Sequence, residues 1–239
     1  MQGRKHNGQG EDSGTRQAIL AAARTLFAEL GFDGTSTQAI VELSQTSKGS
    51  FYHLFASKED LYAAVLEGMM EQIWDASFAT LSDEMIDSDS FWMYIARAWQ
   101  RSVGYMLEHP DEMRLWRGFQ ETWRAIGDAG PARRLRAKNL QMGERLAALG
   151  QQLGCVRCDL SPAQCAELVE ATDMVTDGWF FVIADKHGGR EAFRRQAPLS
   201  LELIWRILAP IEQLSAGEGF PAARYLSADL AAPASEERY

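Results

Sequence analysis

The sequence predicts an all-α protein with a small N-terminal domain and a larger C-terminal helical bundle. Apolar side chains recur with helical periodicity over residues 15–30 and from residue 57 onward, and no segment alternates as a strand does. Between these two regions lie short segments rich in serine and threonine, whose hydroxyl groups can cap the first turns of helices. The expected organisation is a disordered arm over 1–12, a first domain over 13–60, a second over 61–214 and a tail over 215–239.

The first expected helix covers residues 15–30. Ile19, Ala23 and Phe27 share one face of that helix at the spacing of successive turns, so this face should be buried. Gly31 follows directly and is expected to end the helix in a left-handed conformation, which glycine adopts without a steric penalty.

Residues 35–61 have the spacing of a helix-turn-helix motif. Hydroxyl residues at 35–37 precede a short apolar stripe, and the polar residues 44–47 have turn chemistry. Ser47 can cap a second helix whose buried stripe has helical spacing at Phe51 and Phe55. The second helix of such a motif enters the major groove of double-stranded DNA. With Phe51 and Phe55 buried, the residues expected on the exposed side of this helix are Lys48, Gly49, Ser50, Tyr52 and His53.

The order of these motifs resembles the tetracycline-repressor (TetR) family of transcriptional regulators. The matching stretches are ILAAARTLFAELGF, T-S-T-x-x-I, S-K-G-S-F-Y-H-L-F and S-K-E-D-L, which together cover roughly residues 15–65. The resemblance implies that Thr35 and Lys58 hold phosphates from outside the recognition helix. Gln45 stands where the family often has glycine, so its backbone is a place to check for strain. The full set of expected DNA contacts is Thr35, Ser36, Thr46, Ser47, Lys48, Gly49, Ser50, Tyr52, His53 and Lys58.

The net charge of −9 is unevenly distributed along the chain. Residues 1–60 carry six basic and seven acidic side chains, so most of the acidity lies in the C-terminal part. DNA affinity should therefore depend on local groups such as Lys48 and Arg16 rather than on a broad basic field, and we expect a modest salt dependence. No run is long enough to cross a membrane and no signal-peptide pattern is present, so a cytoplasmic protein is expected.

Three cysteines lie close together at Cys155, Cys158 and Cys165. A structural zinc site needs four ligands, and no second CxxC or nearby histidine pair completes the set, so we expect no metal. The spacing leaves two interpretations, a redox pair or reduced cysteines around an interhelical loop, of which we favour the second. No P-loop, G-x-S-x-G, H-E-x-x-H or G-x-G-x-x-G motif is present and no cofactor is implied, so we do not expect an enzyme.

From residue 57 onward, the periodicity predicts a series of helices. Two of them, over 161–186 and 199–214, are apolar on more than one face, which favours packing against a second subunit as well as their own domain. A four-helix dimer interface of this kind is usual in the resembled family. The other expected helices are 57–80, 90–108, 111–127 and 131–152, with a short piece over 189–196. The expected dimer contacts are Val175, Phe180, Ile183, Ile204, Leu208 and Ile211.

Tryptophan is concentrated in the C-terminal part, among scattered methionines. Aromatic and methionine-rich walls suit a pocket for a flat or apolar small molecule, although they also suit an ordinary bundle core. Asp173 or Asp177 could balance a cationic ligand, as could Glu121. That a pocket exists is implied mainly by the resemblance. The candidate ligand-binding residues are Trp99, Trp116, Phe119, Trp123 and Trp179.

Together these features favour a ligand-responsive transcriptional regulator, and a repressor is the preferred form. A homodimer would bind an inverted-repeat operator and be released by a small hydrophobic or aromatic effector. A second interpretation is a sequence-specific DNA-binding protein without an effector, acting as an architectural or partner-controlled factor. That interpretation expects a solid core around the tryptophans.

Overall fold

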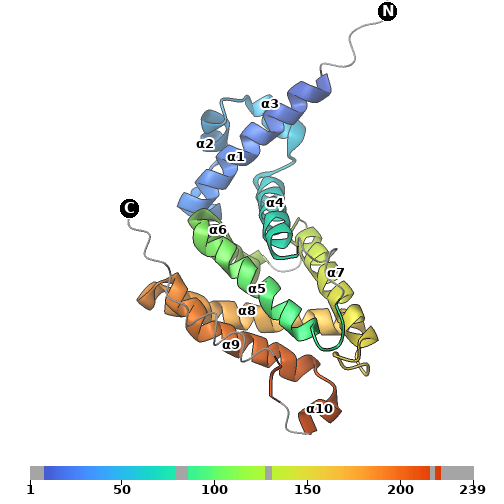
Figure 1. Cartoon of the computed structure of the whole chain (residues 1–239). Coiled ribbons are helices and arrows are strands. Elements are labelled where there is room, and N and C mark those ends of the chain that lie inside the picture. The colour runs from blue at the N-terminus through green and yellow to red at the C-terminus, as the bar shows by residue number, and fades with distance from the viewer. Residues whose placement is uncertain (1–7, 79–85, 127–130, 216–218, 222–239) are drawn as a thin grey trace, which may run out of the picture. The chain divides into compact units, whose positions relative to one another are not determined.

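The computed structural model describes residues 8–78, 86–126, 131–215 and 219–221, and within them the regular structure is helical (Figure 1). The all-α prediction is confirmed. In these residues, no helix is both long enough and apolar enough to cross a membrane. The chain folds as two compact units, the first made of Met1–Ile73 and Glu108–Arg136 and the second of Trp74–Leu107 and Ala137–Tyr239.

The first unit combines two short helices with longer ones packed around them. Its core contains Ile19, Phe27, Ile40, Phe51 and Leu61, all of which are buried. The first two belong to the face that periodicity predicted for the first helix. The helices of this unit are α1 (Gly8–Gly34), α2 (Thr37–Leu43), α3 (Lys48–Leu54), most of α4 (Lys58–Phe78) and α6 (Pro110–Ile126).

Helix α1 is interrupted near its C-terminal end by Gly31. This residue has φ 71° and ψ 176°, so the positive φ expected of it is confirmed, although its ψ is extended rather than left-handed helical. A short helical turn then continues to Gly34. The apolar residues Leu30 and Leu43 are exposed on this unit.

Helix α6 extends the first unit beyond the boundary expected at residue 60. It packs against α1, and the carboxylate of Glu112 in its first turn forms an ion pair with Arg24 of α1. The Arg24 guanidinium also donates to Gln72 Oε1 of α4 at 3.2 Å. Three helices are thereby joined around one half-buried guanidinium, which helps to hold α6 in this unit.

The second unit surrounds a core of aromatic and aliphatic side chains. Phe91 and Trp92 of α5 lie in one buried cluster with Leu201 and Trp205 of α9. Gly150 of α7 permits this packing, since an added Cβ would lie 2.5 Å from Val156 and 2.7 Å from Phe91. The helices of this unit are α5 (Phe91–Glu108), most of α7 (Pro131–Gln152), α8 (Pro162–His187), α9 (Gly189–Leu208) and α10 (Ile211–Ser215).

The end of the predicted helix 199–214 is wrong, and so is its beginning. Helix α9 starts at Gly189 and continues through Pro198, because residues on both sides of the proline, including Ala197 and Leu201, are buried in the core. Tertiary packing thus outweighs the cost of proline inside a helix. Ala209 is extended, as residues before proline prefer, and Pro210 separates α9 from α10.

Both predicted terminal segments include residues that the structure describes. Residues 8–12, expected in a disordered arm, form the start of α1, whereas 1–7 lie outside the described residues. In the predicted surface tail, Phe220 is buried, and its ring centroid lies 6.3 Å from those of Trp92 and Trp205. Residues 216–218 and 222–239 lie outside the described residues.

Candidate functional site

Helices α2 and α3 are both capped by serine hydroxyls, as predicted. Ser36 Oγ accepts a hydrogen bond from the backbone N–H of Ala39 at 3.1 Å, and Ser47 Oγ accepts one from Ser50 at 3.0 Å. Between the helices, Gln45 has φ 54°, a left-handed conformation that is uncommon for residues other than glycine. The half-buried hydroxyl of Thr46 lies 2.8 Å from that of Ser44, inside the turn.

Helix α3 has a buried face and an exposed face in the predicted phase. Phe51 and Phe55 hold it against the unit, with ring centroids 6.1 Å apart. Tyr52 remains 59 % exposed although its ring makes an edge contact with Phe51. The N-terminal turn of the helix is open, since Ser47, Lys48 and Gly49 are all exposed. Lysine, hydroxyl and phenol groups therefore project together from one side of the helix.

Thr35 and Lys58 do not match their predicted role as phosphate contacts. Thr35 is only 2 % exposed, and its hydroxyl lies within hydrogen-bonding distance of the carbonyls of Leu26 at 3.1 Å and Gly31 at 2.7 Å. Lys58 Nζ donates to the carbonyls of Phe32 at 2.8 Å and Thr35 at 3.0 Å. Both side chains satisfy carbonyl groups around the end of α1, so they hold the helices together rather than facing outward.

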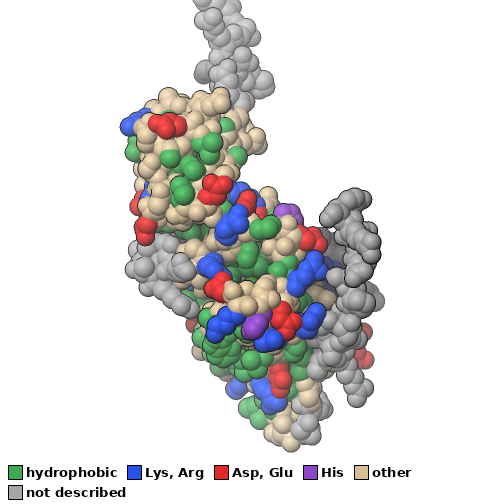
Figure 2. Space-filling model, turned by 90° about the vertical axis from the view of Figure 1, so that its left-hand side faces the viewer, with side chains coloured by type: hydrophobic (Ala, Val, Ile, Leu, Met, Phe, Trp, Pro, Cys, Tyr) green, Lys and Arg blue, Asp and Glu red, His purple; other side chains and the backbone are tan. Residues whose placement is uncertain are grey.

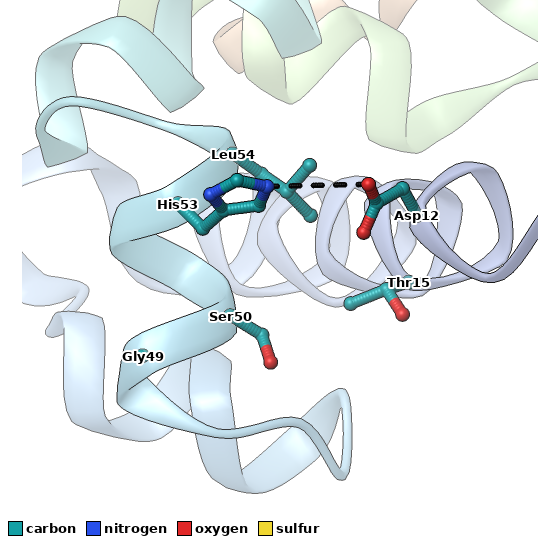
Figure 3. Close-up of a pocket in the computed structure, with 6 residues that line it drawn as sticks. All are labelled: Asp12, Thr15, Gly49, Ser50, His53 and Leu54. Atoms are coloured by element: carbon teal, nitrogen blue, oxygen red, sulfur yellow. Dashed lines mark ion pairs between the residues drawn. The ribbon is translucent and has the colours of Figure 1, made fainter. Parts of the chain in front are cut away.

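His53 faces a shallow hollow between α3 and the N-terminal part of α1 (Figure 3). Its Nε2 lies 3.9 Å from Asp12 Oδ2, and both side chains are well exposed. A protonated imidazole would form an ion pair at this distance. The hollow is lined by Asp12 and Thr15 of α1 and by Gly49, Ser50, His53 and Leu54 of α3.

Charges of both signs are interspersed on the face of the molecule drawn in Figure 2. No broad basic field is visible on that face among the described residues, in keeping with the expectation that any DNA contact is local. Arg16, one of the basic residues expected to assist, has its guanidinium over the ring of Phe55 at 5.4 Å from the centroid. Its guanidinium therefore lies at the C-terminal end of α3, which Phe55 caps.

A family model described as bacterial regulatory proteins of the tetR family matches residues 19–65. This segment runs from the buried face of α1 through α2 and α3 into α4, so it contains the whole exposed face described above. The chain therefore carries a TetR-family segment over residues 19–65.

Curated relatives described as HTH-type transcriptional regulators match the same part of the chain. Residue identity with the regulator RutR of Escherichia coli K12 is 39 % over 72 residues, which are 30 % of this chain and 34 % of RutR. Identity with UidR of the same strain is 45 % over 60 residues, 25 % of this chain and 31 % of UidR. QacR of Staphylococcus aureus Mu50 is 37 % identical over 62 residues, 25 % of this chain and 33 % of QacR. The matches thus span about a third of the length of each relative.

Solved TetR-family structures share the fold over most of the chain. TylP of Streptomyces fradiae has a TM-score of 0.60 and 16 % identity, covering 92 % of this chain and 99 % of TylP. A TetR-family regulator of Pectobacterium atrosepticum has a TM-score of 0.59 and 24 % identity, covering 86 % and 98 %. SmeT, described as the repressor of a Stenotrophomonas maltophilia multidrug efflux pump, has a TM-score of 0.60 and 18 % identity, covering 81 % and 90 %.

The candidate ligand-binding residues are divided between the two units of this chain. Trp99 lies in the second unit, where it stacks on Phe193 with centroids 5.4 Å apart. Trp116 and Phe119 lie in the first unit, with their rings 5.3 Å apart. The side chain of Trp123 is outside the described residues, and Trp179 is exposed on α8.

The predicted dimer contacts also separate into two groups. Phe180, Ile204 and Leu208 are buried within their own protomer, so the expectation that they face a partner is wrong. Val175 and Ile211 are more than half exposed, and Ile183 is half-buried. Sequence reasoning missed part of the exposed apolar stripe on α8, whose spacing of seven, four and three residues places it on one side of the helix. The stripe consists of Leu168, Val175, Trp179 and Val182.

The cysteines are arranged as the reduced interpretation expects. The Cys155 thiol is buried and donates to the Ser88 carbonyl at 3.3 Å, while Cys158 is exposed. Burial raises the pKa of Cys155, and Asp89 and Asp87 raise it further. Burial also raises the pKa of Cys165. Because the thiolate is the reactive form, these two buried thiols are poorly suited to redox chemistry.

The acidic candidates include one strongly perturbed carboxyl group. Burial raises the pKa of Asp173 well above its ordinary value, and the neighbouring charges of Asp177 and Glu170 raise it further. The side chain of Glu121 lies outside the described residues. A neutral carboxyl at this place on α8 could donate a hydrogen bond as well as accept one.

Proposed function

We propose that this chain is a TetR-family transcriptional repressor that binds an inverted-repeat DNA operator as a homodimer. The observation that carries the proposal is the exposed face of α3, where Lys48, Gly49 and Tyr52 project from a helix anchored by Phe51 and Phe55. Lysine, hydroxyl and backbone N–H groups contact phosphates and base edges in DNA grooves. The curated relatives named above are described as helix-turn-helix regulators over this segment.

The exposed stripe on α8 supports a dimer. A contiguous apolar stripe on a helix favours an interaction site, and a symmetric pair of such helices would cover each other. Val182 at 56 % exposure is the most exposed of the four stripe residues. A dimer would present two α3 helices to successive major grooves about 34–36 Å apart, which requires an inverted-repeat site.

An effector would act on the second unit. On α9, Gln196 Nε2 and Ser200 Oγ are buried without a hydrogen-bond partner among the described residues, one turn apart on one side of the helix. Buried polar groups without partners are unfavourable, so a ligand with hydrogen-bonding groups would satisfy them. Phe193, one turn earlier, stacks on Trp99 and would contact an aromatic part of the same molecule.

Helix α4 would transmit the effect, because its residues belong partly to each unit. Leu61, Val65 and Met69 of this helix are buried in the first unit, so a tilt of α4 would carry α2 and α3 with it. A coupling of about 1–3 kcal/mol would weaken DNA binding about 5–150-fold.

The test is selection of bound duplexes from a random DNA library at two salt concentrations, followed by variants. Enrichment of one inverted repeat supports the proposal. Lys48→Ala and Tyr52→Ala should then lose operator binding and remain dimeric, whereas Arg190→Ala, an exposed position on α9, should bind normally. If no sequence is enriched, or if Lys48→Ala binds as well as the unaltered protein, the DNA-binding proposal is refuted.

The effector part needs its own measurement. Tryptophan fluorescence and operator release are recorded with a library of aromatic compounds that carry hydrogen-bonding groups. Compounds that release DNA from the unaltered protein but not from the Gln196→Leu variant would support the site on α9. If no compound changes either signal, the protein is better interpreted as a DNA-binding factor without an effector.

A further inference from the structure

The hollow between α1 and α3 combines hydrogen-bond donors with one acidic side chain. Thr15, Ser50 and His53 can each donate a hydrogen bond, while Asp12 supplies the carboxylate (Figure 3). In the proposed function, α3 lies in a major groove, and the phosphates that border the groove approach its outer residues. The donors in the hollow are suited to such a phosphate, but the carboxylate is not.

We propose that Asp12 competes with a backbone phosphate of the bound DNA for the imidazole of His53. In the free protein, the Asp12 carboxylate lies 3.9 Å from His53 Nε2 and occupies the side of the ring that faces the hollow. A phosphate that binds the same nitrogen must displace this carboxylate and tolerate its charge nearby. Asp12 therefore lowers DNA affinity, and this inference rests on the proposed DNA-binding function.

Asp12 lies outside the segment that matches the family model. The family match begins at residue 19, whereas Asp12 lies seven residues earlier, on the part of α1 that sequence reasoning expected to be disordered. Because α1 is already helical at residue 12, the helix itself places the Asp12 carboxylate near His53 of α3. The contact needs no further residues to position it.

The effect should be modest and independent of DNA sequence. Both side chains are more than half exposed, so their interaction is weakened by solvent. A phosphate contact carries no sequence information, so the competition lowers binding to operator and to unrelated duplexes alike. Removing the carboxylate should tighten both by about two- to fivefold, the range of a single exposed charge pair.

The experiment measures dissociation constants by fluorescence anisotropy for two duplexes, the selected inverted repeat and a scrambled one of equal length. The proteins are the unaltered chain, Asp12→Asn, His53→Gln and the double variant. Glu29→Gln is the matched control, because it removes the same charge from an exposed position of the same helix about 25 Å away.

The expected result is tighter binding of both duplexes by Asp12→Asn, with no such gain from Glu29→Gln. The gain should disappear when Asp12→Asn is combined with His53→Gln. The inference is overturned if Asp12→Asn binds no more tightly, if Glu29→Gln gives the same gain, or if the gain persists without His53. Each of these results leaves the proposed function intact. If the unaltered protein binds neither duplex, the proposed function itself fails and the inference fails with it.

Discussion

Breaking the ion pair between Arg24 and Glu112 should destabilise the first unit by an amount that depends on which partner is removed. The Glu112 side chain is 1 % exposed, whereas that of Arg24 is 32 % exposed and also bonds Gln72. Arg24→Met leaves a buried carboxylate without a counter-charge, which should cost about 3–5 kcal/mol. Glu112→Gln leaves a guanidinium that water and Gln72 still solvate, so its cost should be about 1–1.5 kcal/mol.

Guanidinium denaturation followed by circular dichroism would give these free energies of unfolding, and amide hydrogen exchange would locate the loss in α1 and α6. Arg206→Met is the matched control. It breaks an exposed ion pair with Glu202 on α9 and should cost less than about 1 kcal/mol. The double variant Arg24→Met with Glu112→Leu should recover most of the loss, because apolar replacements of buried pairs are often tolerated. Equal costs for the two single variants, or a larger cost for Glu112→Gln, would refute the reasoning.

Three further predictions concern single positions. Gly150→Ala should lower the free energy of unfolding by about 1–3 kcal/mol, because the added methyl group would overpack the core. Gly104→Ala should raise it by about 0.5–1 kcal/mol, because its added methyl group meets no atom within 4 Å and alanine favours the helix. Thermal unfolding of both variants tests these opposite signs. Gln45→Gly should stabilise the turn by about 0.5–1 kcal/mol because φ is positive there, and an unchanged or lower melting temperature would contradict this. The pKa of Asp173 is raised in the folded protein, so stability should fall as pH rises from its ordinary range toward the folded value. The Asp173→Asn variant should not lose stability over this pH range. Melting temperatures that change with pH in the same way for both proteins would contradict the prediction.

The local features of the recognition segment were predictable because they depend on neighbours in the sequence. Ser36 and Ser47 cap the helices that follow them, and the spacing of Phe51 and Phe55 fixes the buried side of α3. The positive φ of Gln45 followed from its place in the turn. Each of these needs only a few residues of context.

Features that depend on distant packing were not predictable. Thr35 and Lys58 are polar and lie near the motif, which favoured a role in binding DNA. Their hydrogen-bond partners are backbone carbonyls near the end of α1, and these become available only in the folded arrangement of that segment. The sequence of a helix that is apolar on all sides does not reveal which side packs against its own protomer. Phe180 was therefore expected at the dimer interface although it is buried in its own protomer, and the exposed Val182 was not among the expected dimer contacts. The helix expected from residue 199 begins at Gly189 instead, because residues buried on both sides of Pro198 keep it continuous.

The composition of the first unit has a consequence for how the chain is made. Its packing requires α6, which is synthesised after α5, a helix of the second unit. The face of α1 that carries Arg24 therefore stays uncovered on the ribosome until residues 108–136 have emerged. A fragment that ends at residue 73 would keep that face exposed permanently. The N-terminal unit is thus completed late in synthesis, although its recognition segment is among the first parts of the chain to appear.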